Sequence, residues 1–161
     1  MTRKKAESIT GLEILEIPRQ GKIGNAVTFA AYSNGVEIAR RTESGAAHTL
    51  KALVDVLYKR ERRKAFEQQG WRCFVCGAVA PLQADHIKPR SHGRCDQRFN
   101  LRGVDAACHE RITRNQIDPQ PHPEVLAKVE SHGWTWGPES NRHGWVRMAG
   151  ERPTLDAEGN A

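Results

Sequence analysis

The chain has 161 residues, 38% of them hydrophobic and 27% charged, and a formal net charge of +6 at pH 7. This length suits one ordinary domain or two small ones. No stretch approaches the ~18 apolar residues of a membrane span, and no apolar segment follows the basic start MTRKK as in a secretory signal. We therefore expect a cytoplasmic protein without a membrane partner, and the positive charge favours a polyanionic partner such as nucleic acid.

The first 45 residues contain a polar start and three β-rich segments. Residues 1–8 are polar and charged, which predicts a flexible tail. Within residues 9–45, the segments ITGLEILEIP, NAVTFAAYS and GVEIARRTE are bounded by turn-forming residues. Because Asn34 and Gly35 separate the last two segments, we expect a hairpin turn there. The region is predicted to be a small antiparallel sheet.

A helical pattern follows at residues 46–70. Its apolar residues have the spacing of one buried stripe, namely Leu50, Leu53, Val54, Val56, Leu57 and Phe66. Gly70 is suited to end the helix. Residues 59–64 are all charged and five of them are basic, so they form either a solvated helix face or a phosphate-contacting surface. We expect a connecting basic helix here.

Residues 71–116 have a different composition, rich in cysteine, histidine and arginine. The segment CFVCG places two residues between Cys73 and Cys76 and a glycine after them, a spacing that presents two thiolates to one tetrahedral ion. A redox pair would need a preceding strand and a helix opening at the cysteines, and a charged helix precedes them instead. The pattern favours a structural zinc site.

Such a site needs four ligands, and Cys108 can supply the third thiolate. If a helix begins near Asp105, Asp105 and Cys108 are neighbours on one helix face, which makes Asp105 the fourth ligand by geometry. Cys95 is the alternative, because thiolates bind zinc more often than carboxylates do.

A second group of polar residues surrounds the segment QADHIKPR. Asp85 and His86 lie side by side at the end of a short apolar run, just before a basic loop. His109 lies about 100° around its helix from Cys108, so it faces a neighbour other than the zinc site. We expect that neighbour to be the Asp85–His86 pair.

The last part of the chain is an extension, at residues 117–150, that contains a short amphipathic helix ending near Gly133. It also holds Trp134, Trp136 and Trp145, which are expected to pack in a core rather than to stack on bases. Residues 151–161 are expected to be disordered.

Residues 62–115, about a third of the chain, resemble the HNH endonuclease family. The shared pattern is a C-x-x-C pair, a strand that ends in Asp-His, a polar loop, Asn-Leu, and a second C-x-x-C followed by His at the start of a helix. Here it reads CFVCG and then LQADHIKPRSHGRCDQRFNLRGVDAACHERIT. In this chain Asp105 stands where zinc-bearing members have the first cysteine of the second pair. The resemblance implies an α+β fold whose ββα-metal nuclease core, with a structural zinc site, follows a small antiparallel sheet and a long helix.

The family's roles can be carried over to matching positions. His86 would be the general base that takes a proton from water, since imidazoles titrate near neutrality. Asp85 and His109 would hold one catalytic divalent ion, either Mg²⁺, Mn²⁺, Ni²⁺ or Zn²⁺. Asn100 would fix the orientation of His86 by hydrogen bonding across the loop.

Double-stranded DNA is the expected substrate, with one strand nicked. The expected DNA contacts are basic residues of the loop and following helix, namely Lys88, Arg90, Arg94, Arg98, Arg102, Arg111 and Arg114. His92 is a further candidate for phosphate or metal contact. A zinc-stabilised DNA-binding protein without catalysis is the alternative, and an RNA-directed nuclease is a third possibility. The small size and the resemblance suggest a phage or mobile-element protein.

Overall fold

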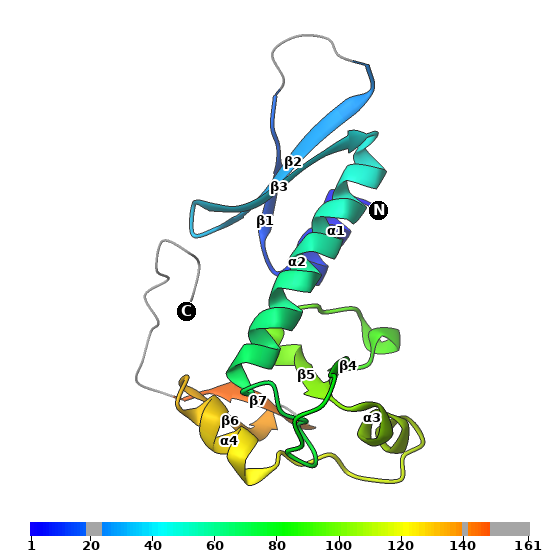
Figure 1. Cartoon of the computed structure of the whole chain (residues 1–161). Coiled ribbons are helices and arrows are strands. Elements are labelled where there is room, and N and C mark those ends of the chain that lie inside the picture. The colour runs from blue at the N-terminus through cyan, green and yellow to red at the C-terminus, as the bar shows by residue number, and fades with distance from the viewer. Residues whose placement is uncertain (19–23, 140–141, 149–161) are drawn as a thin grey trace. The chain divides into compact units, whose positions relative to one another are not determined.

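The computed structural model describes residues 1–18, 24–139 and 142–148 (Figure 1). The described residues form four α-helices, two short 3-10 helices and seven strands, which pair in small antiparallel sheets. This mixture is consistent with the expected α+β class. The chain divides into two compact units, of which the first is Met1–Arg60 and the second begins at Glu61. Residues 151–161, expected to be disordered, lie outside the described residues.

The first unit has the element order α1, β1, β2, β3 and the first part of α2. Its sheet is antiparallel with the strand order β1-β2-β3, formed by Glu13–Glu16, Ala26–Ser33 and Val36–Ser44. Asn34 and Gly35 connect β2 to β3 with positive φ angles of 50° and 80°. The hairpin predicted from these two residues is confirmed, because a two-residue turn of this kind needs positive φ at both positions.

Residues 1–8 are not a flexible tail, because most of them belong to helix α1 (Arg3–Thr10). Thr2 caps the helix by accepting a hydrogen bond from the Lys5 N–H, and Gly11 ends it in the left-handed conformation. The helix buries Ala6 and Ile9 in the core of the first unit. As a result, the first strand begins at Glu13 rather than at residue 9.

Helix α2 (Ala46–Gln68) confirms the long helix predicted at residues 46–70. Its N-terminal part packs Leu50, Leu53, Val54 and Leu57 against side chains of the sheet such as Phe29. Gly70 follows the helix with φ of 65°.

The second unit places two hairpins and two helices around one apolar core. Strands β4 (Gln83–His86) and β5 (Leu101–Val104) are antiparallel, and helix α3 (Ala106–Thr113) follows directly. The 3-10 turns Arg90–His92 and Arg98–Asn100 lie in the loop between β4 and β5. Helix α4 (Pro123–Glu130) precedes the hairpin of β6 (Trp134–Glu139) and β7 (Arg142–Arg147).

An aromatic cluster fills the core of the second unit. Phe74 is fully buried, with its ring centroid 4.9 Å from Trp136 and 5.5 Å from Trp145, both in edge-on geometry. Trp134 packs at its margin, beneath the Arg147 guanidinium at 5.0 Å. The expectation that the tryptophans serve packing is confirmed.

A buried side-chain amide fixes β5 to the end of α2. Gln69 accepts a hydrogen bond from the Gly103 N–H (2.8 Å) and donates one to the Gly103 carbonyl (3.1 Å). Gln69 is only 1% exposed, so these bonds satisfy a strand backbone that water does not reach. This pairing helps to position β5, and the candidate ligands Asp105 and Cys108 lie just after this strand, at the start of α3.

Candidate metal centre and adjacent polar site

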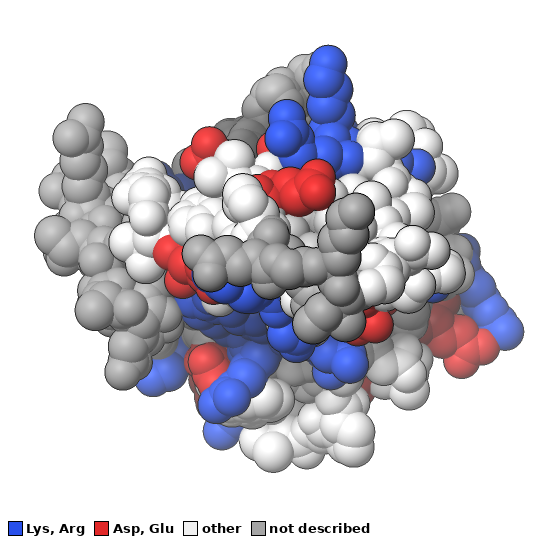
Figure 2. Space-filling view, turned by 90° about the horizontal axis from the view of Figure 1, so that it is seen from above, with Lys and Arg blue, Asp and Glu red and all other residues white. Residues whose placement is uncertain are grey.

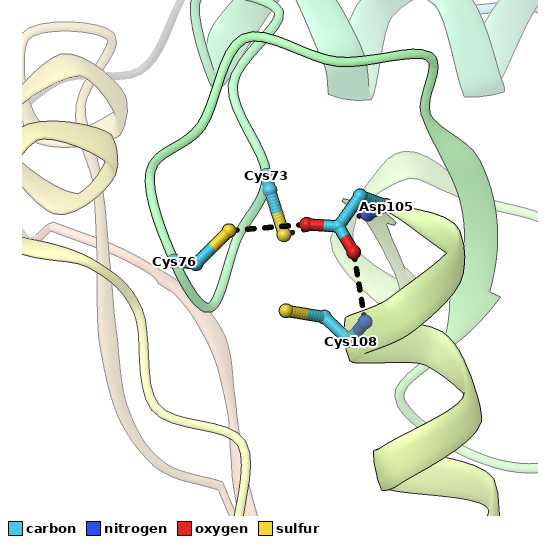
Figure 3. Close-up of side chains that lie close together, drawn as sticks. All are labelled: Cys73, Cys76, Asp105 and Cys108. Carbon is cyan, nitrogen blue, oxygen red and sulfur yellow. Dashed lines mark hydrogen bonds between the residues drawn. The ribbon is translucent and has the colours of Figure 1, made fainter.

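Four potential metal ligands converge in the second unit: Cys73, Cys76, Asp105 and Cys108. One ligand atom of each lies within 4.8 Å of all the others. The first two cysteines come from the turn after α2, and Cys108 comes from the first turn of α3 (Figure 3). Three thiols and a carboxylate held this close together can hold a metal ion. Thiolates bound to one tetrahedral ion lie about 3.8 Å apart, so the cluster needs only small movements to close around it.

Asp105 uses its two carboxylate oxygens differently. Oδ1 accepts a hydrogen bond from the Cys108 N–H at 2.8 Å and thereby caps α3. Oδ2 accepts a hydrogen bond from the Cys76 thiol at 3.0 Å. The helix predicted to start near Asp105 is confirmed, and Asp105 joins the cluster.

Cys95, the alternative fourth ligand, lies outside this cluster. It is a half-buried free thiol in the loop between β4 and β5.

The surroundings of the cluster favour protonated thiols and an ionised Asp105 carboxylate. Partial burial raises the pKa of the Cys76 thiol, and its hydrogen bond to Asp105 raises it further. Burial, with the adjacent Cys73 sulfur, raises the pKa of Cys108 far above its usual range. The Cys108 N–H, helped by the Cys76 thiol, holds the pKa of Asp105 well below its usual range. A bound metal ion would displace the thiol protons, since the thiolate is the ligand form.

Asp85, in strand β4, lies between an arginine and a histidine. Arg102, its cross-strand partner, binds Oδ2 of Asp85 through both Nε and Nη2, each at 2.7 Å. Oδ1 of Asp85 lies 3.8 Å from Nε2 of His109 on α3. The structure therefore brings Asp85 and His109 together, as the sequence predicted.

Arg102 has a different environment from the one expected of a DNA contact. It is 5% exposed, and its guanidinium lies 5.3 Å from the ring centroid of Phe74 as well as on Asp85. Its role in the structure is to neutralise Asp85 and to engage Oδ2, which leaves Oδ1 on the side of His109.

His86 is the last residue of β4 and is hydrogen-bonded to a buried carboxylate. Its Nε2 lies 3.0 Å from Oδ1 of Asp96, and Arg94 binds Oδ2 of Asp96 at 2.6 Å. Burial raises the pKa of the Asp96 carboxyl, but hydrogen bonds to His86 and Arg94 outweigh burial and leave the pKa below its ordinary value. Asp96 is therefore ionised at neutral pH.

Asn100 closes the loop that carries His86 and Asp96. Its side-chain oxygen accepts a hydrogen bond from the Lys88 N–H at 2.7 Å, and its Nδ2 donates to the Cys95 carbonyl at 2.8 Å. The expected hydrogen bonding across the loop is thus present. These bonds hold the backbone on both sides of the loop.

The remaining predicted DNA contacts have mixed environments. Arg90 and Arg111 are exposed, Lys88 is half-buried, and His92 is exposed at the end of a 3-10 turn. Arg114 pairs with Glu110 on the surface of α3, and the Arg98 guanidinium lies 5.9 Å from the Trp134 ring. On the face seen in Figure 2, basic side chains form several groups with acidic ones between them.

Asp96 was not among the site residues predicted from the sequence. It is the only acidic residue between Lys88 and Arg102, and this isolation within a basic loop was the available signal.

No protein-family model, curated protein or solved structure matches the chain, so the geometry of these side chains carries the functional argument.

Proposed function

We propose that the chain is a metal-dependent HNH endonuclease that hydrolyses phosphodiester bonds in double-stranded DNA and nicks one strand. One observation carries the proposal: Asp85 of β4 and His109 of α3, distant in sequence, come together, with Asp85 Oδ1 only 3.8 Å from His109 Nε2, and His86 follows Asp85 at the end of β4. The order of hairpin β4–β5 and helix α3 supports a ββα-metal core.

The donor pair suits a single divalent ion. Metal–ligand distances of about 2.1 Å allow two ligands of one ion to be at most about 4.2 Å apart, and the Asp85–His109 distance lies within this limit. A carboxylate and an imidazole suit Mg²⁺, Mn²⁺, Ni²⁺ or Zn²⁺. When bound, the ion would supply positive charge against the scissile phosphate and the leaving 3′-oxygen.

The chain's own residues would perform the other parts of the reaction. His86, the residue after Asp85, takes the proton from the attacking water as general base. Arg102 engages Oδ2 of Asp85 and thereby leaves Oδ1, the oxygen that lies near His109, for the ion. Arg90, Arg111 and Lys88 supply positive charge near the phosphodiester backbone.

The cluster of three cysteines and Asp105 would hold a structural Zn²⁺. Its thiol-rich set matches the ligands that zinc prefers, and all four ligand positions come from the protein. The ion would tie the turn after α2 to the start of α3, the helix that carries His109.

Plasmid cleavage tests the proposal directly. The full chain is freed of divalent ions, given one equivalent of Zn²⁺, and incubated with supercoiled plasmid and each candidate ion in turn. The wild type should convert the plasmid to open circles. His86→Ala should lower the rate by at least about 100-fold, the contribution of a general base. The matched control is His48→Ala, an exposed histidine of α2 in the first unit.

Other results have definite meanings. Direct conversion to linear DNA would show paired sites and hence a dimer. DNA binding without cleavage under any ion would favour the zinc-stabilised, non-catalytic DNA-binding protein. Cleavage of an RNA strand but not of plasmid would show that the substrate is RNA.

A further inference from the structure

Asp96 is buried within the polar loop and points its carboxylate at His86. It is 2% exposed, and its Oδ1 lies 3.0 Å from His86 Nε2. Its Oδ2 accepts hydrogen bonds from Arg94 through Nε at 2.8 Å and Nη2 at 2.6 Å. A buried carboxylate with both oxygens engaged in this way has a fixed position.

We propose that Asp96 is a positioning residue that holds the proton of neutral His86 on Nε2 and so makes Nδ1 the atom that accepts a proton from water. The inference rests on the proposed function and deepens it.

The chemistry of the carboxylate gives the direction of the hydrogen bond. An aspartate paired with a guanidinium is ionised and can only accept, so Nε2 of His86 must be the donor. In a neutral imidazole, the nitrogen that does not carry the proton is the base. An asparagine at this position would remove that restriction, because its amide can donate as well as accept.

The same contact assists the reaction step. As the water oxygen bonds to phosphorus and the bond to the leaving 3′-oxygen breaks, one water proton moves to Nδ1 of His86. The imidazolium so formed donates from Nε2 to the anionic Asp96, which stabilises its charge. Solvent then removes the proton from Nδ1 and protonates the leaving oxygen, so the histidine returns to its starting form.

An NMR measurement on the wild-type chain tests the tautomer without relying on activity. A long-range ¹H–¹⁵N correlation spectrum of the imidazole rings is recorded on the full chain with its structural metal, over a pH series that includes the neutral form of the ring. The His86 signals are assigned by their loss in His86→Gln. We expect the neutral ring to carry its proton on Nε2. A neutral ring that carries its proton on Nδ1 would overturn the proposal.

The Asp96→Asn variant tests the positioning role, with Asp55→Asn, an exposed aspartate of α2, as the matched control. Asp96→Asn should alter the His86 tautomer pattern and lower kcat by about 100-fold, with KM changed less than about threefold. Asp55→Asn should change none of these. If Asp96→Asn leaves the tautomer pattern and kcat unchanged, Asp96 is not a positioning residue.

The two proposals fail in different ways. A wild-type chain that cleaves no phosphodiester with any ion would refute the proposed function. The wild-type spectrum would still decide the hydrogen bond, even where Asp96→Asn does not fold.

Discussion

At the scale of single residues, the Asp105 carboxylate makes one contact within its own helix and one with a residue distant in sequence. One oxygen of its carboxylate caps α3, and the other lies against the Cys76 sulfur. Cysteine at this position would offer a softer ligand but no oxygen for the cap. The structure thus gives a physical reason for a carboxylate among three cysteines.

Two substitutions separate the helix-capping role of Asp105 from its proposed role as a metal ligand. Asp105→Asn keeps an oxygen for the cap and loses the anionic ligand, so zinc affinity should fall by more than about 100-fold, beyond the effect of losing an outer-shell contact. Asp105→Cys keeps four anionic ligands and loses the cap, which should cost about 1 kcal/mol of stability with zinc bound. Chelator competition measures the affinity, and urea unfolding measures the stability. Equal zinc affinity in Asp105→Asn and the wild type would exclude Asp105 as a ligand.

Gln69 illustrates how one buried polar residue can hold a strand. In Gln69→Leu, the Gly103 N–H loses the partner that Gln69 supplies and remains away from water, whereas the Gly103 carbonyl keeps its hydrogen bond from the Phe74 N–H. We expect the free energy of unfolding to fall by about 1–3 kcal/mol, the cost of one unsatisfied buried group. Gln116→Leu, at an exposed position, is the control and should change it by less than about 0.5 kcal/mol. Similar urea midpoints for both variants would contradict this account.

At the scale of elements, the sequence predicted the helices and hairpins that have a strong hydrophobic periodicity or characteristic turn residues. The stripe of α2 and the Asn34–Gly35 turn each show a local signal, and the structure has both elements. Helix α1 was missed because it is short and its polar residues outnumber the two apolar ones, Ala6 and Ile9, that reach the core. A helix of this length is stabilised mainly by tertiary packing, which no local pattern shows.

The polar site was predicted only in part for a related reason. Asp85 and His109 follow from motif spacing, whereas the Asp85–Arg102 pair depends on the register of β4 and β5. That register places Arg102 directly opposite Asp85. The number of arginines in the loop does not show whether one of them pairs with a carboxylate across the sheet or contacts a phosphate. Asp96 was missed because its contact with His86 exists only after the loop closes.

The packing of β5 against α2 gives a prediction at this scale. A Cβ at Gly103 would lie 2.8 Å from Cδ1 of Phe66 and 3.0 Å from Cδ1 of Leu82. Gly103→Ala should therefore lower the free energy of unfolding by about 1–3 kcal/mol through overpacking. Gly137→Ala is the control, because its Cβ would meet only Cγ2 of Val146 at 4.0 Å. Thermal unfolding of both variants checks the difference, and equal melting temperatures would show that the side chains yield without cost.

At the scale of the whole molecule, the two units are stabilised differently. The first has an apolar core in which α1 and α2 pack against the sheet. The core of the second includes Cys73 and Cys108, so two of its buried side chains are also candidate metal ligands. Among the described residues, no helix is long and apolar enough to cross a membrane.

Removal of the proposed structural metal should therefore act on the second unit alone. Without the ion, the turn after α2 and the first turn of α3 lose the ligand bonds between them, and small domains gain much of their folding free energy from such sites. We expect a strong chelator to lower the melting temperature of one transition and to raise hydrogen exchange in peptides containing Cys73 or Cys108. Peptides of β2 and of the N-terminal part of α2 should keep their protection, since their core contains no candidate ligand.

Cys95→Ala is the matched control and should respond to the chelator as the wild type does. Unchanged melting and exchange after complete chelation would show that the cluster is no structural metal site, whereas loss of protection in both units would show that they unfold together.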